Sequence, residues 1–534
     1  MRRWNGWGGD AIETSLPPRA RELLETLIGP GTPPRDATLD EIAATVPPSR
    51  LVGVGPWLDD DPRTRIRHAR GQSLPDWVAL RSGRLGAVPD AVGQPPDAAA
   101  VRDLMALGAR TGAALLPYGG GTSVVGGVTA RQSDRPVVTV DMSTTAGLRS
   151  LDETSGLATF GAGTTGPSIE SALAQHGMTL GHYPQSFEFS TVGGWVVTRS
   201  AGQQSRGFGR IEDLFAGGHL ETPRGPFDIQ SYPASAAGPD LREIVLGSEG
   251  RLGILTDVTV RATAAPRLER FAGYLVPDWD RALVLARRLA RSGLPLSMVR
   301  VSTPLETATT FALAGDSRAT GVLRRYLGWR GMGPERCLAI IGLTGNPGVV
   351  GAAARAVDDL VRGSQGVAGP GIGSAWRHGR FSAPYLRNAL WDAGYAVDTL
   401  ETATDWTTLP DLAAALGRTL RHGLEGENER VHAFSHLSHG YPSGSSLYVT
   451  YVFRLASDPD ATLERWRTLK SAASRIVVEH GATISHQHGV GTDHAPYLAA
   501  EKGALGMQAI NALIRTFDPD GRMARGILLE DGAP

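Results

Sequence analysis

Two histidines separated by one residue are the side chains in this sequence best spaced for acid–base chemistry. His486 and His488 flank Gln487 in a bend that leads into Gly489-Val-Gly491. Residues i and i+2 of an extended segment face the same way, so we expect both imidazoles to meet one ligand. Imidazole can carry a proton, whereas the amide of Gln487 can donate a hydrogen bond but cannot carry a proton. The bend therefore predicts a site that handles charge.

A tyrosine in a predicted strand is the next candidate. The alternating segment 447–453 places Tyr448 on one face with Thr450 and Val452, and its other side chains on the opposite face. Most tyrosines in strands are packed core residues. A phenol has an ordinary pKa of about 10, so Tyr448 needs positive charge nearby to act as a base near neutrality. We expect the histidines of the bend to supply that charge.

A metal site is a competing interpretation of this region. The chain carries enough imidazoles for one: His432, His436, His439, His486, His488 and His494. Neither a CxxC nor an HExxH motif accompanies them. We therefore expect no bound metal.

A glycine-rich loop could hold phosphate. Pro117-Tyr-Gly-Gly-Gly-Thr-Ser123 follows a predicted strand, and three glycines allow positive φ and bare N–H groups that form an anion-binding nest. The loop is neither a Walker loop nor a GxGxxG fingerprint. Two more glycine bends, Ser190-Thr-Val-Gly-Gly194 and Gly247-Ser-Glu-Gly-Arg-Leu-Gly253, occur in the same region. Together, the three bends predict a binding site for a large, flat cofactor with two phosphates.

These residues require an α+β fold that brings distant segments together. A length of 534 residues predicts two or three domains. Residues 1–83 are predicted to form a helical lead-in, 84–266 a domain of short strands with the glycine bends, 267–430 a second α+β domain, and 431–534 a segment that completes the site. Helices are predicted at 20–27, 39–45, 98–110, 166–176, 279–292, 351–363, 409–422 and 461–480, and strands at 113–117, 137–142, 254–263, 337–343 and 447–453.

Composition narrows the class of protein. The formal net charge is −1, which gives no reason to expect nucleic acid or an anionic membrane as the main partner. The single cysteine, Cys337, cannot form an internal disulfide, so we expect a reducing, cytoplasmic compartment. The first residues lack the apolar run of a secretory signal, and no run approaches the roughly 20 apolar residues of a membrane span.

The three bends, in this order, resemble the FAD-binding domain of the vanillyl-alcohol oxidase superfamily. Within it, the chain is most similar to the alkylglycerone-phosphate synthase family of ether-lipid synthesis. The motifs that carry the resemblance are Trp4-Asn-Gly-Trp-Gly8, Glu188-Phe-Ser-Thr-Val-Gly-Gly-Trp195, Ile211-Glu-Asp-Leu214, Thr222-Pro-Arg-Gly225, Ser485-His-Gln-His-Gly-Val-Gly491 and Asp518-Pro519. The resemblance implies a two-part FAD-binding domain, 84–266, and an α+β cap for substrate, 267–430.

The resemblance also implies which residues hold the cofactor. Some superfamily members bond a His or Cys to the flavin, but Thr122 stands near the usual His position and Cys337 lies outside the FAD domain, so we expect noncovalent FAD. The cofactor-binding candidates are Pro117, Tyr118, Gly119, Gly120, Gly121, Thr122, Ser123, Gln185, Ser186, Ser190, Thr191, Gly194, Thr198, Arg199, Ser200, Ala201, Glu249, Gly250, Gly253 and Ile254.

The activity implied by the resemblance is the exchange of the acyl group of acyl-dihydroxyacetone phosphate for a fatty alcohol through a flavin N5 adduct, without net redox. Tyr448 would be the base that shuttles the substrate proton, and Arg387 would bind the phosphate. Arg300 matches a second active-site arginine, and His486 and His488 would stabilise charge, with Gln487 contacting substrate. We expect the protein to be a homodimer that acts on a lipid substrate. Any contact with the inner membrane surface is expected to be peripheral.

A second interpretation stays open at this point. The family carries three consecutive histidines where this chain has Gln487 in the middle, and Gln185 stands where the family has an acidic residue. The same architecture also serves FAD-dependent dehydrogenases or oxidases of 2-hydroxy acids and related alcohols, because fold does not fix function. In that case an arginine would bind a carboxylate and the histidines would act as bases.

Overall fold

The computed structural model describes residues 2–51, 55–314 and 318–530. Its helices are α1 (Pro18–Ile28), α2 (Leu39–Ala43), α3 (Pro62–Arg67), α4 (Leu74–Ser82), α5 (Ala98–Thr111), α6 (Gly166–Ala174), α7 (Val192–Thr198), α8 (Ser205–Phe208), α9 (Ile211–Leu214), α10 (Arg242–Val245), α11 (Trp279–Arg291), α12 (Pro304–Leu313), α13 (Arg318–Trp329), α14 (Pro347–Gly363), α15 (Ile372–Gly379), α16 (Leu386–Asp392), α17 (Leu409–His422), α18 (Pro459–Glu479) and α19 (Ala495–Phe517). Short 3-10 turns lie at Met142–Thr144, Ala383–Tyr385 and Glu425–Glu427. In the described residues no helix is long and apolar enough to cross a membrane.

The strands form four sheets in the described part of the chain. They are β1 (Leu58–Asp59), β2 (Ala91–Gly93), β3 (Ala114–Tyr118), β4 (Val137–Asp141), β5 (Leu148–Asp152), β6 (Leu157–Gly161), β7 (Met178–Thr179), β8 (Phe215–Thr222), β9 (Gly225–Ile229), β10 (Ile254–Arg261), β11 (Thr263–Ala264), β12 (Leu268–Val276), β13 (Leu296–Ser302), β14 (Cys337–Gly345), β15 (Val367–Ala368), β16 (Tyr395–Asp405), β17 (His432–Gly440) and β18 (Gly444–Arg454).

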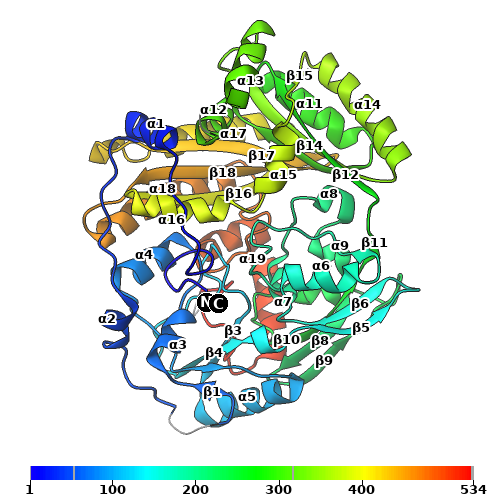
Figure 1. Ribbon diagram of the computed structural model, residues 1–534. Helices are drawn as coiled ribbons and strands as arrows, with labels where there is room; N and C mark the ends of the chain where they lie inside the picture. The colour runs from blue at the N-terminus through cyan, green and yellow to red at the C-terminus, as the bar shows by residue number, and fades with distance from the viewer. Residues whose placement is uncertain (1, 52–54, 315–317, 531–534) are drawn as a thin grey trace.

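The N-terminal lobe contains a four-stranded sheet of order β1-β2-β4-β3 and a five-stranded antiparallel sheet of order β5-β6-β10-β8-β9 (Figure 1). The glycine loop follows β3 directly, because Gly112 in the left-handed conformation ends α5 and turns the chain into that strand. Two segments from opposite ends of the described chain meet at this place. Arg2 lies against the glycine loop, and the backbone N–H of Ala524 donates to the carbonyl of Leu115 at 2.8 Å.

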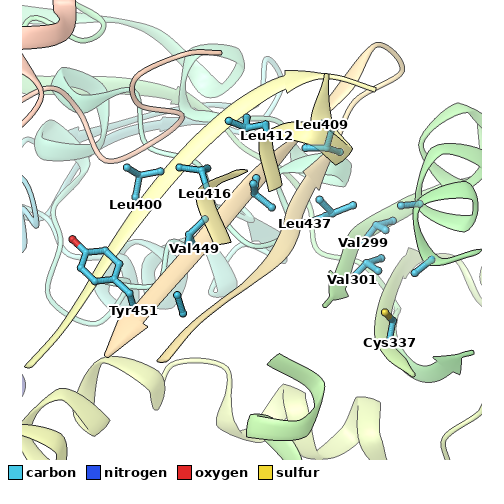
Figure 2. Close-up of a cluster of buried hydrophobic side chains, with 14 of the residues drawn as sticks. Val299, Val301, Cys337, Leu400, Leu409, Leu412, Leu416, Leu437, Val449 and Tyr451 are labelled. Carbon is cyan, nitrogen blue, oxygen red and sulfur yellow. The ribbon is translucent and has the colours of Figure 1, made fainter. Parts of the chain in front are cut away.

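The second lobe is built on one antiparallel seven-stranded sheet of order β15-β12-β14-β13-β17-β18-β16, with helices α11, α14, α17 and α18 packed on one face. Figure 2 shows the apolar side of this sheet, where Leu400, Leu437, Val449 and Tyr451 meet leucines of α17. The register of β16, β17 and β18 puts Glu401, Tyr448 and His436 opposite one another, on the side away from the apolar core. The sheet therefore holds the candidate site on this side.

The α+β class is confirmed, and every predicted helix and strand overlaps one in the structure. The alternation predicted for 447–453 is also confirmed, since Leu447, Val449, Tyr451 and Phe453 are all buried in the core. The sequence analysis did not predict α19, which packs its apolar side against the five-stranded sheet. The predicted border after residue 430 falls inside the seven-stranded sheet, because β17 and β18 follow it.

Candidate active site

Three neighbouring strands place three polar side chains in one row. His436 of β17 lies opposite Tyr448 of β18, and Tyr448 lies opposite Glu401 of β16. Directly opposed residues of an antiparallel ladder have Cβ atoms about 4.5–5.5 Å apart. The rings of His436 and Tyr448 stack with their centroids 5.0 Å apart. The register that buries the apolar side of β18 therefore also fixes Tyr448 between an imidazole and a carboxylate.

A β-bulge adds a fourth side chain to this row. The ladder between β17 and β18 shifts register between Leu437 and Gly440, so β17 has one residue more than its partner there. Such a bulge re-aims the side chains that follow it. His439 comes to lie beside His486, with the two ring centroids 5.0 Å apart. Burial lowers the pKa of His439 to about 3, so this imidazole is neutral.

Arg300 lies at the other end of the row, where it is paired with a buried acid. Its Nη2 donates to Glu306 Oε1 at 2.6 Å and lies 3.2 Å from His436 Nδ1, which in turn is 3.0 Å from Glu306 Oε2. Burial alone would raise the pKa of Glu306, but His436 and Arg300 outweigh it and lower the pKa to about 2. Glu306 thus holds Arg300 and His436 beside Tyr448.

The histidine bend runs along the free edge of β16. The backbone N–H of His486 donates to the carbonyl of Glu401 at 3.2 Å. The side chain of His486 then lies with Nδ1 3.1 Å from Glu401 Oε1, while His488 Nε2 is 3.8 Å from Glu401 Oε2. The two imidazoles therefore do meet one group, and that group is the buried carboxylate of Glu401.

The contacts of His486 define its protonation state. Arg210 Nη1 lies 2.8 Å from His486 Nε2, and the Tyr441 hydroxyl lies 2.7 Å from the same nitrogen. A guanidinium can only donate, so Nε2 must be the acceptor and Nδ1 must carry the hydrogen that is donated to Glu401. Burial lowers the pKa of His486 well below its usual value, in agreement with a neutral ring.

Tyr448 is a protonated phenol in this environment. Burial is the main cause that raises its pKa to about 12, and Glu401 and Asp398 add to the increase. Burial also lowers the pKa of His488, whose ring meets that of Tyr448 edge to face at 5.7 Å. The expectation that the histidines provide positive charge for Tyr448 is wrong, because burial keeps them neutral.

Arg387 of α16 is a buried cation between the site and the N-terminal segment of the chain. Its guanidinium lies over Trp77 at 4.5 Å from the ring centroid and donates to the carbonyl of Gln72 through Nη1. Nη2 is buried and has no hydrogen-bond acceptor among the described residues. Tyr448 and Asp398 lie close enough to Arg387 to affect its pKa, which burial lowers. Arg387 therefore has its Nη2 amino group available for an anion.

The glycine loop has the properties of an anion site. Among the described residues, the backbone N–H groups of residues 120–123 donate to no protein acceptor. Gly121 has φ of 59°, and a Cβ at Gly120 would fall on the carbonyl of Phe189, so the loop lies directly against the backbone of the second bend. Arg2 donates to the carbonyls of Gly120 and Gly121 from the other side. The donor set fits the diphosphate of FAD.

The third bend connects the loop to the histidines. Gly250, with φ of 78°, packs against Pro117 of the loop. The carboxylate of Glu249 accepts from the N–H groups of Val490 at 2.6 Å and Gly491 at 2.7 Å. Glu249 thus fixes the backbone that follows His488, a role that the prediction as a cofactor residue did not foresee.

Several predicted cofactor residues use their side chains within the protein. The hydroxyls of Tyr118, Ser190 and Thr198 donate to the backbone carbonyls of Arg67, Ser186 and Gly194, respectively. Ser200 Oγ is bonded to His182, and Gln185 Nε2 donates to the carbonyl of Arg380. Thr191 caps α7 by accepting from the N–H of Gly194. Arg199 pairs with Glu243, and Ile254 lies in the core. Ser186, Ala201 and Gly253 line the same bends, and their contact with FAD stays a prediction.

Among the described residues, one group could supply three metal ligands. Atoms of Glu401, His439 and His486 lie within 4.8 Å of one another. The guanidinium of Arg210 on His486 places a positive charge next to this group, which opposes a cation. Gln487, the departure from the family pattern, has its Oε1 buried without a hydrogen-bond partner among the described residues, and its contact with substrate stays a prediction.

The comparisons with known proteins agree with this arrangement. Residues 89–227 match the family described as "FAD binding domain" and residues 265–528 the family described as "FAD linked oxidases, C-terminal domain". An alkyldihydroxyacetonephosphate synthase of Dictyostelium discoideum is 31% identical over 473 residues, which cover 86% of this chain and 77% of that protein. A solved alkyldihydroxyacetonephosphate synthase structure has a TM-score of 0.84 and 27% identity, and covers 98% of both chains. p-Cresol methylhydroxylase, at 14% identity and a TM-score of 0.69, covers 97% of both chains and shares the fold.

Proposed function

The chain belongs to the alkyldihydroxyacetonephosphate synthase family of FAD-dependent enzymes, and from this premise we propose that it exchanges the acyl group of acyl-dihydroxyacetone phosphate for a fatty alcohol. The observation that supports this substrate is Arg387. It is a buried guanidinium whose Nη2 has no acceptor among the described residues, and Tyr448, the phenol that would move the substrate proton, lies near enough to affect its pKa. A guanidinium fork suits a phosphate monoester.

The residues of the chain divide the work among binding, proton movement and charge stabilisation. Arg387 binds the phosphate and thereby sets the distance between the substrate carbon and Tyr448. Tyr448 exchanges a proton with the carbon beside the carbonyl, and Arg300, held by Glu306, donates to the developing charge on oxygen. When bound, FAD supplies an electrophilic flavin ring. The N–H groups of the glycine loop hold its diphosphate.

We also propose that FAD is held without a covalent bond. Thr122 stands in the loop where a linking histidine would be, and Cys337 is fully buried in β14 of the seven-stranded sheet. Precipitating the purified protein with trichloroacetic acid tests this directly. Yellow colour in the supernatant supports noncovalent FAD, and a yellow pellet contradicts it.

One experiment distinguishes the synthase activity from a dehydrogenase activity on 2-hydroxy acids. The dehydrogenase is worth testing because Gln487 departs from the family pattern. The FAD-loaded protein is mixed with palmitoyl-dihydroxyacetone phosphate and hexadecanol, and separately with a panel of 2-hydroxy acids. Release of palmitate together with formation of the ether product supports the proposal. Bleaching of the oxidised flavin band by a hydroxy acid, without palmitate release, contradicts it.

A further inference from the structure

Glu401 has no place in the roles assigned above, although it is the acid at the centre of the site. Its side chain is 0% exposed, and it lies directly across the ladder from Tyr448. One carboxylate oxygen, Oε1, accepts from His486 at 3.1 Å. The other, Oε2, is buried without a hydrogen-bond partner among the described residues and faces His488 Nε2 at 3.8 Å. A buried carboxylate that keeps one oxygen unpaired is costly, so it requires a reason.

Tyr448 supplies that reason, because it is a protonated phenol. It can take a proton from substrate only if its own proton leaves at the same time. His488 meets the Tyr448 ring edge to face, and its Nε2 faces Glu401, so Nδ1 is the nitrogen left to accept. A proton on His488 would convert the 3.8 Å approach into an ion pair with Glu401. This is the logic of an acid that stabilises an imidazolium formed during a reaction.

His486 cannot replace His488 in this relay. Its Nε2 already accepts from Arg210 and Tyr441, and its Nδ1–H is committed to Glu401. His486 instead transmits the position of Arg210 to Glu401, and keeps Oε2 turned toward His488.

We propose that Glu401 is a positioning residue of the proton relay, which orients His488 and balances the charge that His488 takes from Tyr448. The assignment rests on the proposed function. In the step, the C–H bond beside the substrate carbonyl breaks and its electron pair moves toward the carbonyl oxygen. The proton goes to the Tyr448 oxygen, and the phenolic proton goes to His488. Return of both protons resets the site.

Glu401→Gln is the decisive variant, because it keeps the shape and the bond from His486 while it removes the charge. Glu401→Asp keeps the charge. Glu429→Gln is the control, since Glu429 is also a buried acid but lies away from the site, where it is paired with Arg454 at the far end of β18. All three proteins are prepared with FAD bound, and flavin content and melting temperature are measured first.

The first measurement is the dependence of kcat/KM for palmitoyl-dihydroxyacetone phosphate on pH, and in particular the limb on the acid side of this profile. His488 must be neutral to accept a proton, and Glu401 raises its pKa, so loss of the charge moves the limb to lower pH, by about one unit or more. We expect kcat to fall at least about 100-fold with KM little changed. Glu401→Asp keeps the limb in place, as does Glu429→Gln. An unmoved limb in Glu401→Gln, or equal loss in both Glu401 variants, overturns the proposal.

The second measurement needs no substrate, so that it separates this proposal from the proposed function. NMR of the ¹³C-histidine-labelled holoenzyme gives the pKa of His488, assigned through His488→Asn. Other titratable groups face the two residues: Tyr448, His436, His439, His486, Lys470 and Asp398. They are common to both proteins, so a lower pKa in Glu401→Gln supports the relay and an equal pKa contradicts it. Stoichiometric zinc that is present in the wild type and lost in Glu401→Gln would also overturn it, in favour of a metal site.

Discussion

Removal of the side chain of Arg2 should weaken FAD binding. The guanidinium donates to the carbonyl of Gly120 and, at 2.9 Å, to that of Gly121. Arg67 donates to the carbonyl of Arg2 at 2.9 Å and holds it in place. The loop carbonyls are thus bonded to Arg2, while the N–H groups of residues 120–123 have no acceptor among the described residues and are available for a diphosphate.

The size of the effect follows from these two bonds. A hydrogen bond that involves a charged group contributes about 1.5–3 kcal/mol, and water replaces part of that at a half-buried position. We expect Arg2→Ala to lose about 2 kcal/mol, which is a roughly 30-fold rise in the Kd of FAD. Titration of the apoprotein with FAD, followed by quenching of flavin fluorescence, measures the Kd.

Arg3→Ala is the control, since Arg3 has the same charge but its guanidinium makes no hydrogen bond to the loop among the described residues. An unchanged Kd in Arg2→Ala would refute the role of Arg2 in shaping the loop. Equal weakening in both variants would refute it as well, because the effect would then come from net charge alone.

Three further outcomes are expected. Arg387→Gln should raise the KM for palmitoyl-dihydroxyacetone phosphate about 10–100-fold with a smaller change in kcat, since one or two charge-assisted bonds are lost; an unchanged KM would place the phosphate elsewhere. Glu306 ionises with a pKa lowered from 4.5 to about 2, so it stabilises the fold by about 3 kcal/mol above pH 4.5, and this is lost as the pH falls toward 2. In urea unfolding, the free energy of unfolding of Glu306→Gln should not show this decrease at acid pH. The same decrease in the variant and in the wild-type protein would contradict the assignment. Glu249→Gln leaves an N–H of Val490 or Gly491 without an acceptor, which should lower stability by about 1–3 kcal/mol and also reduce kcat, and an unaffected kcat would separate Glu249 from the histidine bend.

The sequence was sufficient to predict the parts of the site that depend on local pattern. Alternation in β18 predicted which face Tyr448 would occupy, because burial of Val449 and Tyr451 leaves no other register. The i, i+2 spacing of His486 and His488 predicted that their side chains would face the same group. The glycines of the loop after β3 predicted free N–H groups.

The residues that the sequence analysis missed depend on contacts between distant parts of the chain. Arg210 and His486 are 276 positions apart, and Arg2 and Gly120 are 118 apart, so no local pattern connects them. Glu401 carries a signal that could have been used, because it and Asp398 are acids inside a strand whose other interior residues are apolar or bear hydroxyls. The protonation states of Tyr448 and His439 follow from burial, which only the packed sheet reveals.

Hydrogen exchange at the substrate tests the central claim most directly. The FAD-loaded protein is incubated in D₂O with palmitoyl-dihydroxyacetone phosphate and no alcohol, and the hydrogens on the carbon that bears the acyl group are followed by NMR. The account predicts enzyme-dependent exchange, with the flavin remaining oxidised, and a loss of about 1,000-fold or more in Tyr448→Phe, which still binds FAD. Absence of exchange in the wild-type protein, or equal exchange in Tyr448→Phe, would contradict the claim that Tyr448 moves the substrate proton.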